Sequence, residues 1–149
     1  MVDIYGDFLL SDNLIGTFEA DRIWGFGGND FIIGGAGSDA LNGGTGNDTI
    51  QAGDGDNAVD GQDGNDFIIA GDGNDYILGG VGNDTIQAGN GNNPLDGQDG
   101  DDSITAGDGN DSIWGGAGHD TIQAGAGDNI IDGQDGDDSI TAGDGSDTI

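Results

Sequence analysis

The chain has 149 residues, 35 of them Gly, and its 30 acidic residues against one basic residue give a formal net charge of −29. This composition resembles that of disordered chains, and its negative charge makes nucleic acid and anionic membranes unfavourable partners. The lack of Cys excludes disulfides and thiolate metal sites, and no apolar run approaches the roughly 18 residues of a transmembrane helix.

Residues 1–24 are the least regular part of the chain. The opening MVDIYGDFLLSDNLI has no basic segment followed by a long apolar run, so it is not an ordinary signal peptide. An acidic residue followed two positions later by a large apolar residue still recurs every nine residues. These pairs are Asp3 with Tyr5, Asp12 with Leu14 and Asp21 with Ile23. We predict that residues 1–24 form a degenerate N-terminal coil or coils, serving as a cap or as a docking segment.

Residues 25–149 repeat a nine-residue unit without any insertion. Counted from Gly25 as position 1, position 4 is always Gly and position 8 is always aliphatic, from Ile32 to Ile149. Position 6 is Asp in eleven units and Asn in three. Asp combined with Gly supplies oxygen ligands in tight turns, which suits a hard divalent cation such as calcium.

The repeat predicts short strands joined by glycine turns. Gly at every unit makes a helix unfavourable, whereas positions 7 to 9 alternate outward, inward and outward as in a strand. Positions 1 to 6 form a turn in which Gly provides backbone with φ > 0. Two units then complete a coil, and coils stack at about 4.8 Å into two parallel sheets. Between the sheets lies a single layer of position 8 side chains, which is too thin a core to fold the chain alone.

The unit reads GGxGxDxUx, where U is aliphatic, and over about nine tenths of its length the chain resembles the RTX (repeats-in-toxin) family of calcium-binding nonapeptide repeats. The resemblance implies an all-β fold, a right-handed parallel β-roll of two parallel sheets with 18 residues per coil and calcium in the turns. It also implies that position 6 carboxylates of neighbouring turns share each ion with backbone carbonyls. About a dozen or more ions at +2 each would nearly cancel the net charge, so that calcium binding would drive folding.

The candidate calcium ligands fall into two rows, one on each side of the predicted roll. The all-Asp row contains Asp30, Asp48, Asp66, Asp84, Asp102, Asp120 and Asp138. The mixed row contains Asp39, Asn57, Asp75, Asn93, Asp111, Asn129 and Asp147. Asp12 and Asp21 occupy the same phase in the degenerate segment.

A second period of 36 residues, equal to two coils, places Asn in alternate turns of the mixed row. Because Asn lowers the local charge, we expect this row to bind calcium less tightly. The alternative is that Asn ligates through its carbonyl oxygen and both rows behave alike.

Several other residues have competing interpretations. His119 is the only His and is interpreted as a solvated turn residue; Arg22, the only cation, either pairs with an acid or is an ordinary surface residue, and Glu19 has no special role. Outward positions 7 and 9 carry unexpected apolar residues, which are covered by flanking segments, merely favour strands, or mediate lateral contacts between rolls. They are Phe31, Ile33, Phe67, Ile69, Tyr76, Leu78, Trp114 and Ile130.

No Ser/His/Asp or Cys/His set can be assembled from this chain, so we do not expect an enzyme. The first hypothesis is an extracellular structural protein, secreted or on the cell surface, that folds on calcium and self-associates into a fibre, surface layer or adhesive matrix. The final unit stops at position 8 with Ile149, which predicts an uncapped edge open to end-to-end stacking, and the start at Met1 favours a complete small protein. The alternative is an RTX repeat module of a larger type I-secreted hydrolase, toxin or adhesin, aiding secretion and folding.

Overall fold

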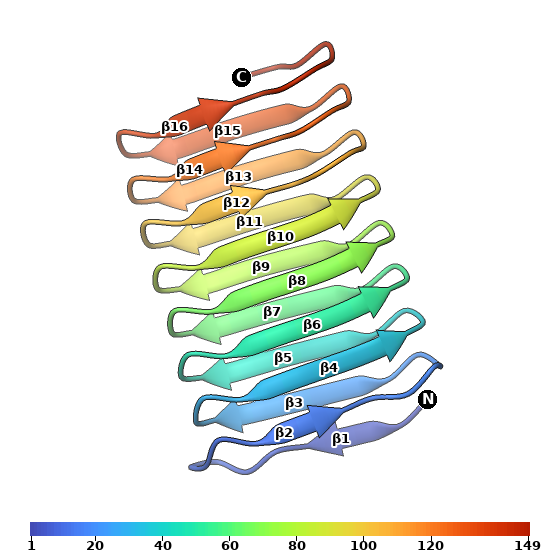
Figure 1. Cartoon of the computed structure of the whole chain (residues 1–149). Coiled ribbons are helices and arrows are strands. Elements are labelled where there is room, and N and C mark those ends of the chain that lie inside the picture. Colours follow the sequence, from blue (N-terminus) through green and yellow to red (C-terminus); the bar gives the residue numbers. More distant parts are fainter.

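The structure, a computed structural model, describes all residues 1–149 and consists of sixteen strands without a helix. Odd-numbered strands form one eight-stranded sheet and even-numbered strands the other (Figure 1). All pairings within both sheets are parallel. The predicted all-β solenoid of two parallel sheets is therefore confirmed. The structure contains no helix that is long and apolar enough to span a membrane.

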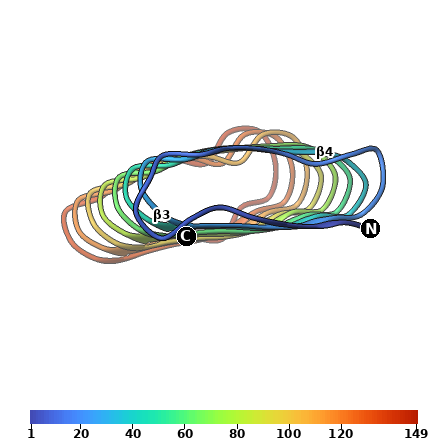
Figure 2. The same ribbon diagram turned by 90° about the horizontal axis from the view of Figure 1, so that it is seen from below.

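The odd sheet contains β1 (Asp3–Tyr5), β3 (Arg22–Gly27), β5 (Ala40–Thr45), β7 (Ala58–Asp63), β9 (Tyr76–Val81), β11 (Pro94–Asp99), β13 (Ser112–Ala117) and β15 (Ile130–Asp135). The even sheet contains β2 (Asn13–Ile15), β4 (Phe31–Ala36), β6 (Thr49–Asp54), β8 (Phe67–Asp72), β10 (Thr85–Asn90), β12 (Ser103–Thr105), β14 (Thr121–Gln123) and β16 (Ser139–Thr141). Viewed along the stack, the two sheets lie face to face and tight turns join them at both sides (Figure 2).

The register between coils follows the repeat. Ile68 of β8 pairs with Ile50 of β6 and with Ile86 of β10, a shift of 18 residues on each side. Each coil therefore places every position of the unit directly above its equivalent in the coil below. Equivalent positions of the unit are repeated at the strand spacing from the second coil onward, and the two turn rows run along the two long edges of Figure 1.

The first coil departs from the predicted phase by one residue. Ile4, and not Tyr5, pairs with Ile23 and packs against the core. Tyr5 points outward and stacks on Trp24 at a ring distance of 5.0 Å. The prediction that Tyr5 occupies position 8 is wrong, because the extra residue lies in the turn before β2. There the Asp7 carboxylate accepts the backbone N–H groups of Leu9 and Leu10 and stabilises a longer turn.

Most strands are longer than predicted. They run for six residues, from position 7 of one unit to position 3 of the next, and only positions 4 to 6 form the turn. Position 2, which was assigned to the turn, is held at positive φ inside the strand, as in Gly53 at 92° and Gly71 at 114°. Gly allows this conformation without breaking the parallel ladder, in which Gly71 still pairs with Gly89.

The core is wider than the predicted single layer. Position 8 residues of both sheets are buried between the sheets, as predicted, but position 1 of the even sheet also faces inward. Its alanines Ala52, Ala70, Ala88, Ala106 and Ala124 are fully buried. In the odd sheet position 1 is Gly in every coil from Gly25 to Gly133. Ala in place of the Gly of the GGxGxDxUx pattern at position 1 therefore adds a second apolar row in the even sheet.

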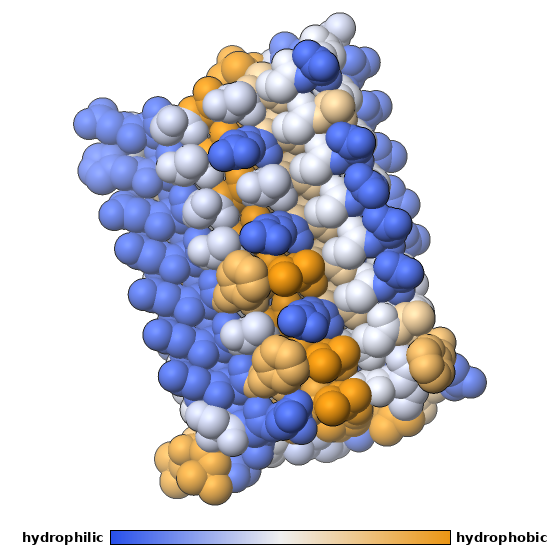
Figure 3. All heavy atoms as spheres, in the orientation of Figure 1, coloured by the Kyte–Doolittle hydropathy of each residue, from blue (hydrophilic) through white to orange (hydrophobic).

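The outer face of the even sheet carries apolar side chains towards its N-terminal half (Figure 3). Phe31 and Ile33 on β4 and Phe67 and Ile69 on β8 are half-buried by their neighbours, and no other segment of the chain covers them. Tyr76 and Ile130, on the odd sheet, are 51% and 56% exposed. The interpretation that flanking segments cover these residues does not hold within residues 1–149.

Ile130 and Ile131 are adjacent on β15 and point to opposite faces of the odd sheet. Substituting each in turn tests which of the two faces forms the core. Ile131 is 2% exposed, so Ile131→Ala should lower the unfolding free energy by about 2–5 kcal/mol. Ile130→Ala, on the outer face, should change it by less than about 1 kcal/mol. Chemical denaturation of both variants in saturating calcium measures the difference. Equal effects would contradict the assigned register.

Candidate calcium centre

The position 6 side chains of both rows form a ladder between coils. The backbone N–H of each position 6 residue donates to Oδ1 of the equivalent residue one coil further along the chain. Asp48 donates to Asp66 and Asp66 to Asp84, at 2.7 Å in both cases. The Asn residues take part in the same way, since Asp39 donates to Asn57 Oδ1 at 2.9 Å. One carboxylate oxygen of each Asp is thus satisfied by the backbone of the neighbouring coil.

The second carboxylate oxygen has no partner. In nine Asp residues Oδ2 is buried and accepts no hydrogen bond from the protein. Six belong to the all-Asp row and three to the mixed row: Asp30, Asp48, Asp66, Asp84, Asp102 and Asp120, with Asp39, Asp75 and Asp111. Each of these residues is at most 3% exposed. A buried anionic oxygen without a partner is strongly unfavourable, so these nine atoms require a cation or a proton.

Burial shifts the acidity of these groups. It raises the pKa of Asp48, Asp84 and Asp102 to about 7 and that of Asp66 to about 6. The N–H donated by the adjacent coil opposes the shift, and neighbouring carboxylates, such as Asp66 and Asp30 beside Asp48, add to it. Stacked carboxylates in a low-dielectric row resist ionisation unless positive charge lies between them.

Glycine at position 1 of the odd sheet lies beside the unpartnered oxygen. A Cβ atom added to Gly61 would fall against Oδ2 of Asp66 and against the carbonyl oxygen of Gly79 in the next coil. The same overlap occurs at Gly43, with Asp48 Oδ2 and the Gly61 carbonyl. At this position of the odd sheet, the carboxylate oxygen and a carbonyl of the neighbouring coil therefore both lie close to the Gly Cα atom.

Carbonyl oxygens from two coils complete the surroundings. The carbonyls of positions 2 and 4 face the coil above, as Gly44 and Gly64 show: an added Cβ there would meet the carbonyl oxygens of Phe26 and Gly46. No group of three His, Cys, Asp or Glu side chains converges anywhere, so a cation in a turn would take most ligands from carbonyls. Calcium accepts six to eight such oxygens in flexible geometry, and the Asp turns therefore fit calcium.

The N-terminal candidates differ from the rest. Oδ2 of Asp12 accepts the backbone N–H of Asp7 at 2.7 Å. Oδ2 of Asp21 accepts both the N–H and the hydroxyl of Thr17 at 2.7 Å, and this hydroxyl lowers the pKa of Asp21. In the last coil Asp138 and Asp147 are only half-buried. None of these four residues has a buried Oδ2 atom without a hydrogen-bond partner, unlike the nine Asp residues above. Calcium ligation by these four residues stays a prediction.

The three Asn residues of the mixed row present a donor where the Asp residues present an acceptor. Asn57 Nδ2 donates to the carbonyls of Gly53 and Gly55 at 3.1 and 2.9 Å. Asn93 Nδ2 donates to Gly91 and Asn129 Nδ2 to Gly127. The two rows are therefore unequal in structure. This favours the interpretation that the mixed row binds calcium less tightly than the all-Asp row.

A second ladder at position 5 was missed by the sequence analysis. Here the backbone N–H donates in the opposite direction, to the side chain one coil back, as from Asn65 to Asn47 at 2.9 Å. His119 belongs to this ladder, because its N–H donates to Asp101 and its Nδ1 accepts the N–H of Asp137 at 3.0 Å. The frequency of Asn and Asp at position 5 was the available signal. His119 is exposed, as expected.

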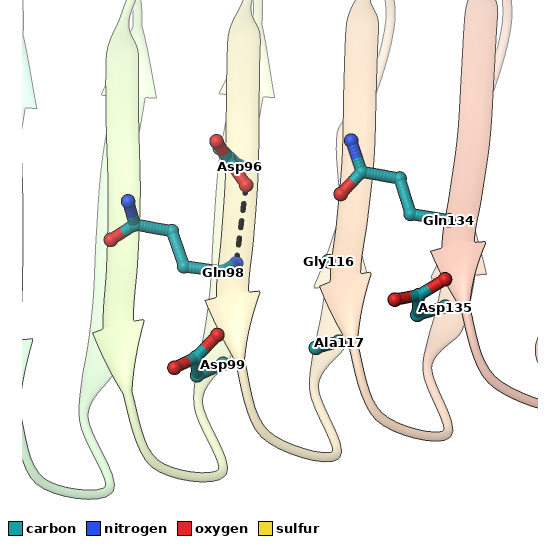
Figure 4. Close-up of a pocket in the computed structure, with 7 residues that line it drawn as sticks. All are labelled: Asp96, Gln98, Asp99, Gly116, Ala117, Gln134 and Asp135. Carbon is teal, nitrogen blue, oxygen red and sulfur yellow. Dashed lines mark hydrogen bonds between the residues drawn. The ribbon is translucent and has the colours of Figure 1, made fainter.

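Several other charged residues do not belong to the position 6 rows. Arg22 is exposed and forms no ion pair, whereas Glu19 accepts a hydrogen bond from the N-terminal amine at 2.8 Å. Asp96 and Asp99 line a groove of about 420 Å³ on the outer face of the odd sheet, above Gly116 (Figure 4). Asp96 accepts the N–H of Gln98 at 3.1 Å there. These outward carboxylates do not belong to the position 6 rows.

The raised pKa values predict how the metal-free chain responds to pH. Because burial raises the folded pKa of Asp48, Asp84 and Asp102 to about 7, against 3.8 for an unperturbed Asp, protonation favours the metal-free fold. This stabilisation is complete below about pH 4 and is lost as pH rises through 7. Circular dichroism of the calcium-free protein should therefore gain sheet signal between pH 8 and 5. A loss of signal over that range would contradict the burial of these carboxylates.

Comparison with known families agrees with this geometry. The family model for the RTX calcium-binding nonapeptide repeat (4 copies) matches residues 10–41, 33–68, 51–86, 60–95, 87–122 and 114–149. These overlapping segments together cover the chain from residue 10 to residue 149. No curated protein matches the chain.

Proposed function

The chain belongs to the RTX calcium-binding nonapeptide repeat family, and from this premise we propose that it is an extracellular structural β-roll that folds on calcium and self-associates. The observation that carries the proposal is the set of nine buried, unpartnered carboxylate oxygens. With one basic residue in the chain, the protein cannot neutralise them itself. Divalent cations between the coils would supply both the missing charge and the missing contacts.

The low affinity expected for these sites supports an extracellular location. Most ligands are neutral carbonyls and each turn contributes one carboxylate, so calcium affinity in the millimolar to submillimolar range typical of extracellular modules is expected. Free calcium in the cytosol is far too low to fill such sites. The chain would remain unfolded there and would fold after export.

Self-association is supported by exposed apolar residues on the first coil. Phe8, Leu9 and Phe18 are 75%, 86% and 92% exposed, and they lie in the two turns of this coil. Hydrophobic side chains gather at this end of the molecule in Figure 3, next to edges that are otherwise polar. Exposed apolar groups at one end of a solenoid mark a contact surface.

In this proposal the coil that contains β16 packs against the first coil of another copy. In the last coil Ile140 is only partly buried and Ile149 is 74% exposed, and Asp138 and Asp147 lie in its two turns. Stacking on a first coil would bury these aliphatic residues and provide parallel strand partners. The open-ended contact would give fibres or layers held by the same ions as the monomer.

The alternative function is a repeat module of a larger type I-secreted hydrolase, toxin or adhesin. In that case the exposed first coil would pack against another domain of the same polypeptide. The mass of the native polypeptide distinguishes the two functions. In either case we propose no catalytic role, since the buried carboxylates are accounted for by calcium.

Calcium-dependent folding is the first test. In excess chelator at pH 8 the chain should lack sheet signal in circular dichroism, and millimolar calcium should restore it cooperatively. Magnesium should substitute poorly because it gives up its water reluctantly and demands octahedral geometry. A stable sheet signal in chelator would refute the proposal.

Association is the second test. Light scattering at high protein concentration should show large particles in millimolar calcium that dissolve on chelation. The double variant Leu9→Ser with Phe18→Ser should remain monomeric. The matched control Val81→Ser with Ile130→Ser removes two residues that are 55% and 56% exposed on the odd sheet, and it should still associate. Loss of association in the control alone would indicate lateral contacts, and a monomeric wild type would favour the module.

A further inference from the structure

The mixed row contains turns in which the protein itself occupies the place of the ion. We call the space between a turn and the equivalent turn one coil further along the chain the gap above the position 6 residue of the first turn. We infer that the gaps above Asn57, Asn93 and Asn129 are closed by the Asn side-chain amide and bind no calcium. Calcium then fills nine gaps, one above each unpartnered Asp oxygen. The inference rests on the proposed function only in that the Asp gaps bind calcium.

The orientation of each Asn amide is fixed at both ends. Asn57 Oδ1 accepts the N–H of Asp39 at 2.9 Å, while Nδ2 donates to two carbonyls of its own turn. Rotating the amide by 180° would place the oxygen against the carbonyls and the NH₂ group against an N–H. All three hydrogen bonds would be lost, so the amide nitrogen is the atom that faces the turn.

The carbonyls that receive the amide are those that face the next coil. A Cβ atom added to Gly71 would fall against the Gly53 carbonyl oxygen, and one added to Gly73 against that of Gly55. Both oxygens therefore point into the gap between the coils that contain Asn57 and Asp75. Equivalent carbonyls in the Asp turns would be calcium ligands, but here they already accept N–H groups.

The other two Asn turns repeat this arrangement. The Gly91 carbonyl, which accepts Asn93 Nδ2 at 3.4 Å, faces Gly109. The Gly127 carbonyl, which accepts Asn129 Nδ2 at 3.2 Å, faces Gly145. None of the three Asn side chains has an unsatisfied buried atom, in contrast to the nine Asp residues.

The lower negative charge of the Asn gaps also disfavours calcium binding there. A closed gap lacks the carboxylate of the turn below it, and calcium affinity falls with the number of anionic ligands. To bind there, an ion would have to displace the amide and leave a buried NH₂ group facing a cation. The gaps below the Asn coils, above Asp39, Asp75 and Asp111, remain open because their Oδ2 atoms are free. Open and closed gaps therefore alternate along the mixed row with the period of 36 residues.

Counting bound calcium tests this directly. Equilibrium dialysis against saturating calcium, with elemental mass spectrometry of the protein and buffer compartments, should give nine bound ions per wild-type chain. The triple variant Asn57→Asp, Asn93→Asp, Asn129→Asp should bind three more. The matched control Asn65→Asp, Asn83→Asp, Asn110→Asp adds the same charge at exposed position 5 and should add none.

Asp66→Asn provides the reciprocal test. The new amide can keep the ladder through its oxygen and close its gap through its nitrogen, so the chain should fold and bind one ion fewer. In calcium-loaded wild type, the side-chain amide protons of Asn57, Asn93 and Asn129 should exchange slowly in NMR.

Two results would overturn the inference. The triple variant could gain no more ions than its control, or the wild type could already hold twelve. In both cases the proposed calcium-dependent fold would stand, whereas a folded wild type that binds no calcium would refute that function as well.

Discussion

The repulsion between stacked, buried carboxylates is the constraint on which this structure depends. Eighteen residues per coil place equivalent positions directly above one another, so an Asp that recurs at position 6 forms a row of stacked carboxylates. Burial raises the pKa of several members to about 6 or 7, because their charge is unfavourable without a counterion. A thin aliphatic core cannot offset a row of such charges, so the fold and its cations form a single thermodynamic unit.

The other regular features follow from this requirement. Oδ1 of each position 6 residue holds the neighbouring coil through a backbone N–H, and this fixes the direction of Oδ2. Position 1 of the odd sheet is Gly and lies beside that oxygen, whereas position 1 of the even sheet is Ala from Ala52 onward and adds core volume. The two sheets are thus specialised: one accommodates the all-Asp row, and the other contributes more apolar burial behind a row with fewer charges.

The sequence predicted the architecture because its repeat has no insertions after Gly25. Position 8 and position 6 were correctly placed in the core and in the turns, since burial and charge make these two types unambiguous. The strand length was wrong because Gly at positive φ is typical of turns, yet Gly71 here remains within a parallel ladder. The phase of Tyr5 was wrong because a one-residue insertion in a degenerate segment leaves Ile4 and Tyr5 as equal alternatives. Ladder bonds and the direction of an Asn amide depend on atomic positions that a repeat pattern does not contain.

A crystal structure of the calcium-loaded protein, with anomalous scattering recorded to locate the ions, tests the central claim most directly. The account predicts an anomalous peak beside each of the nine Asp Oδ2 atoms that lack a hydrogen-bond partner. A map in which these oxygens are bound by water or by protein donors, with no ion in the turns, would contradict it.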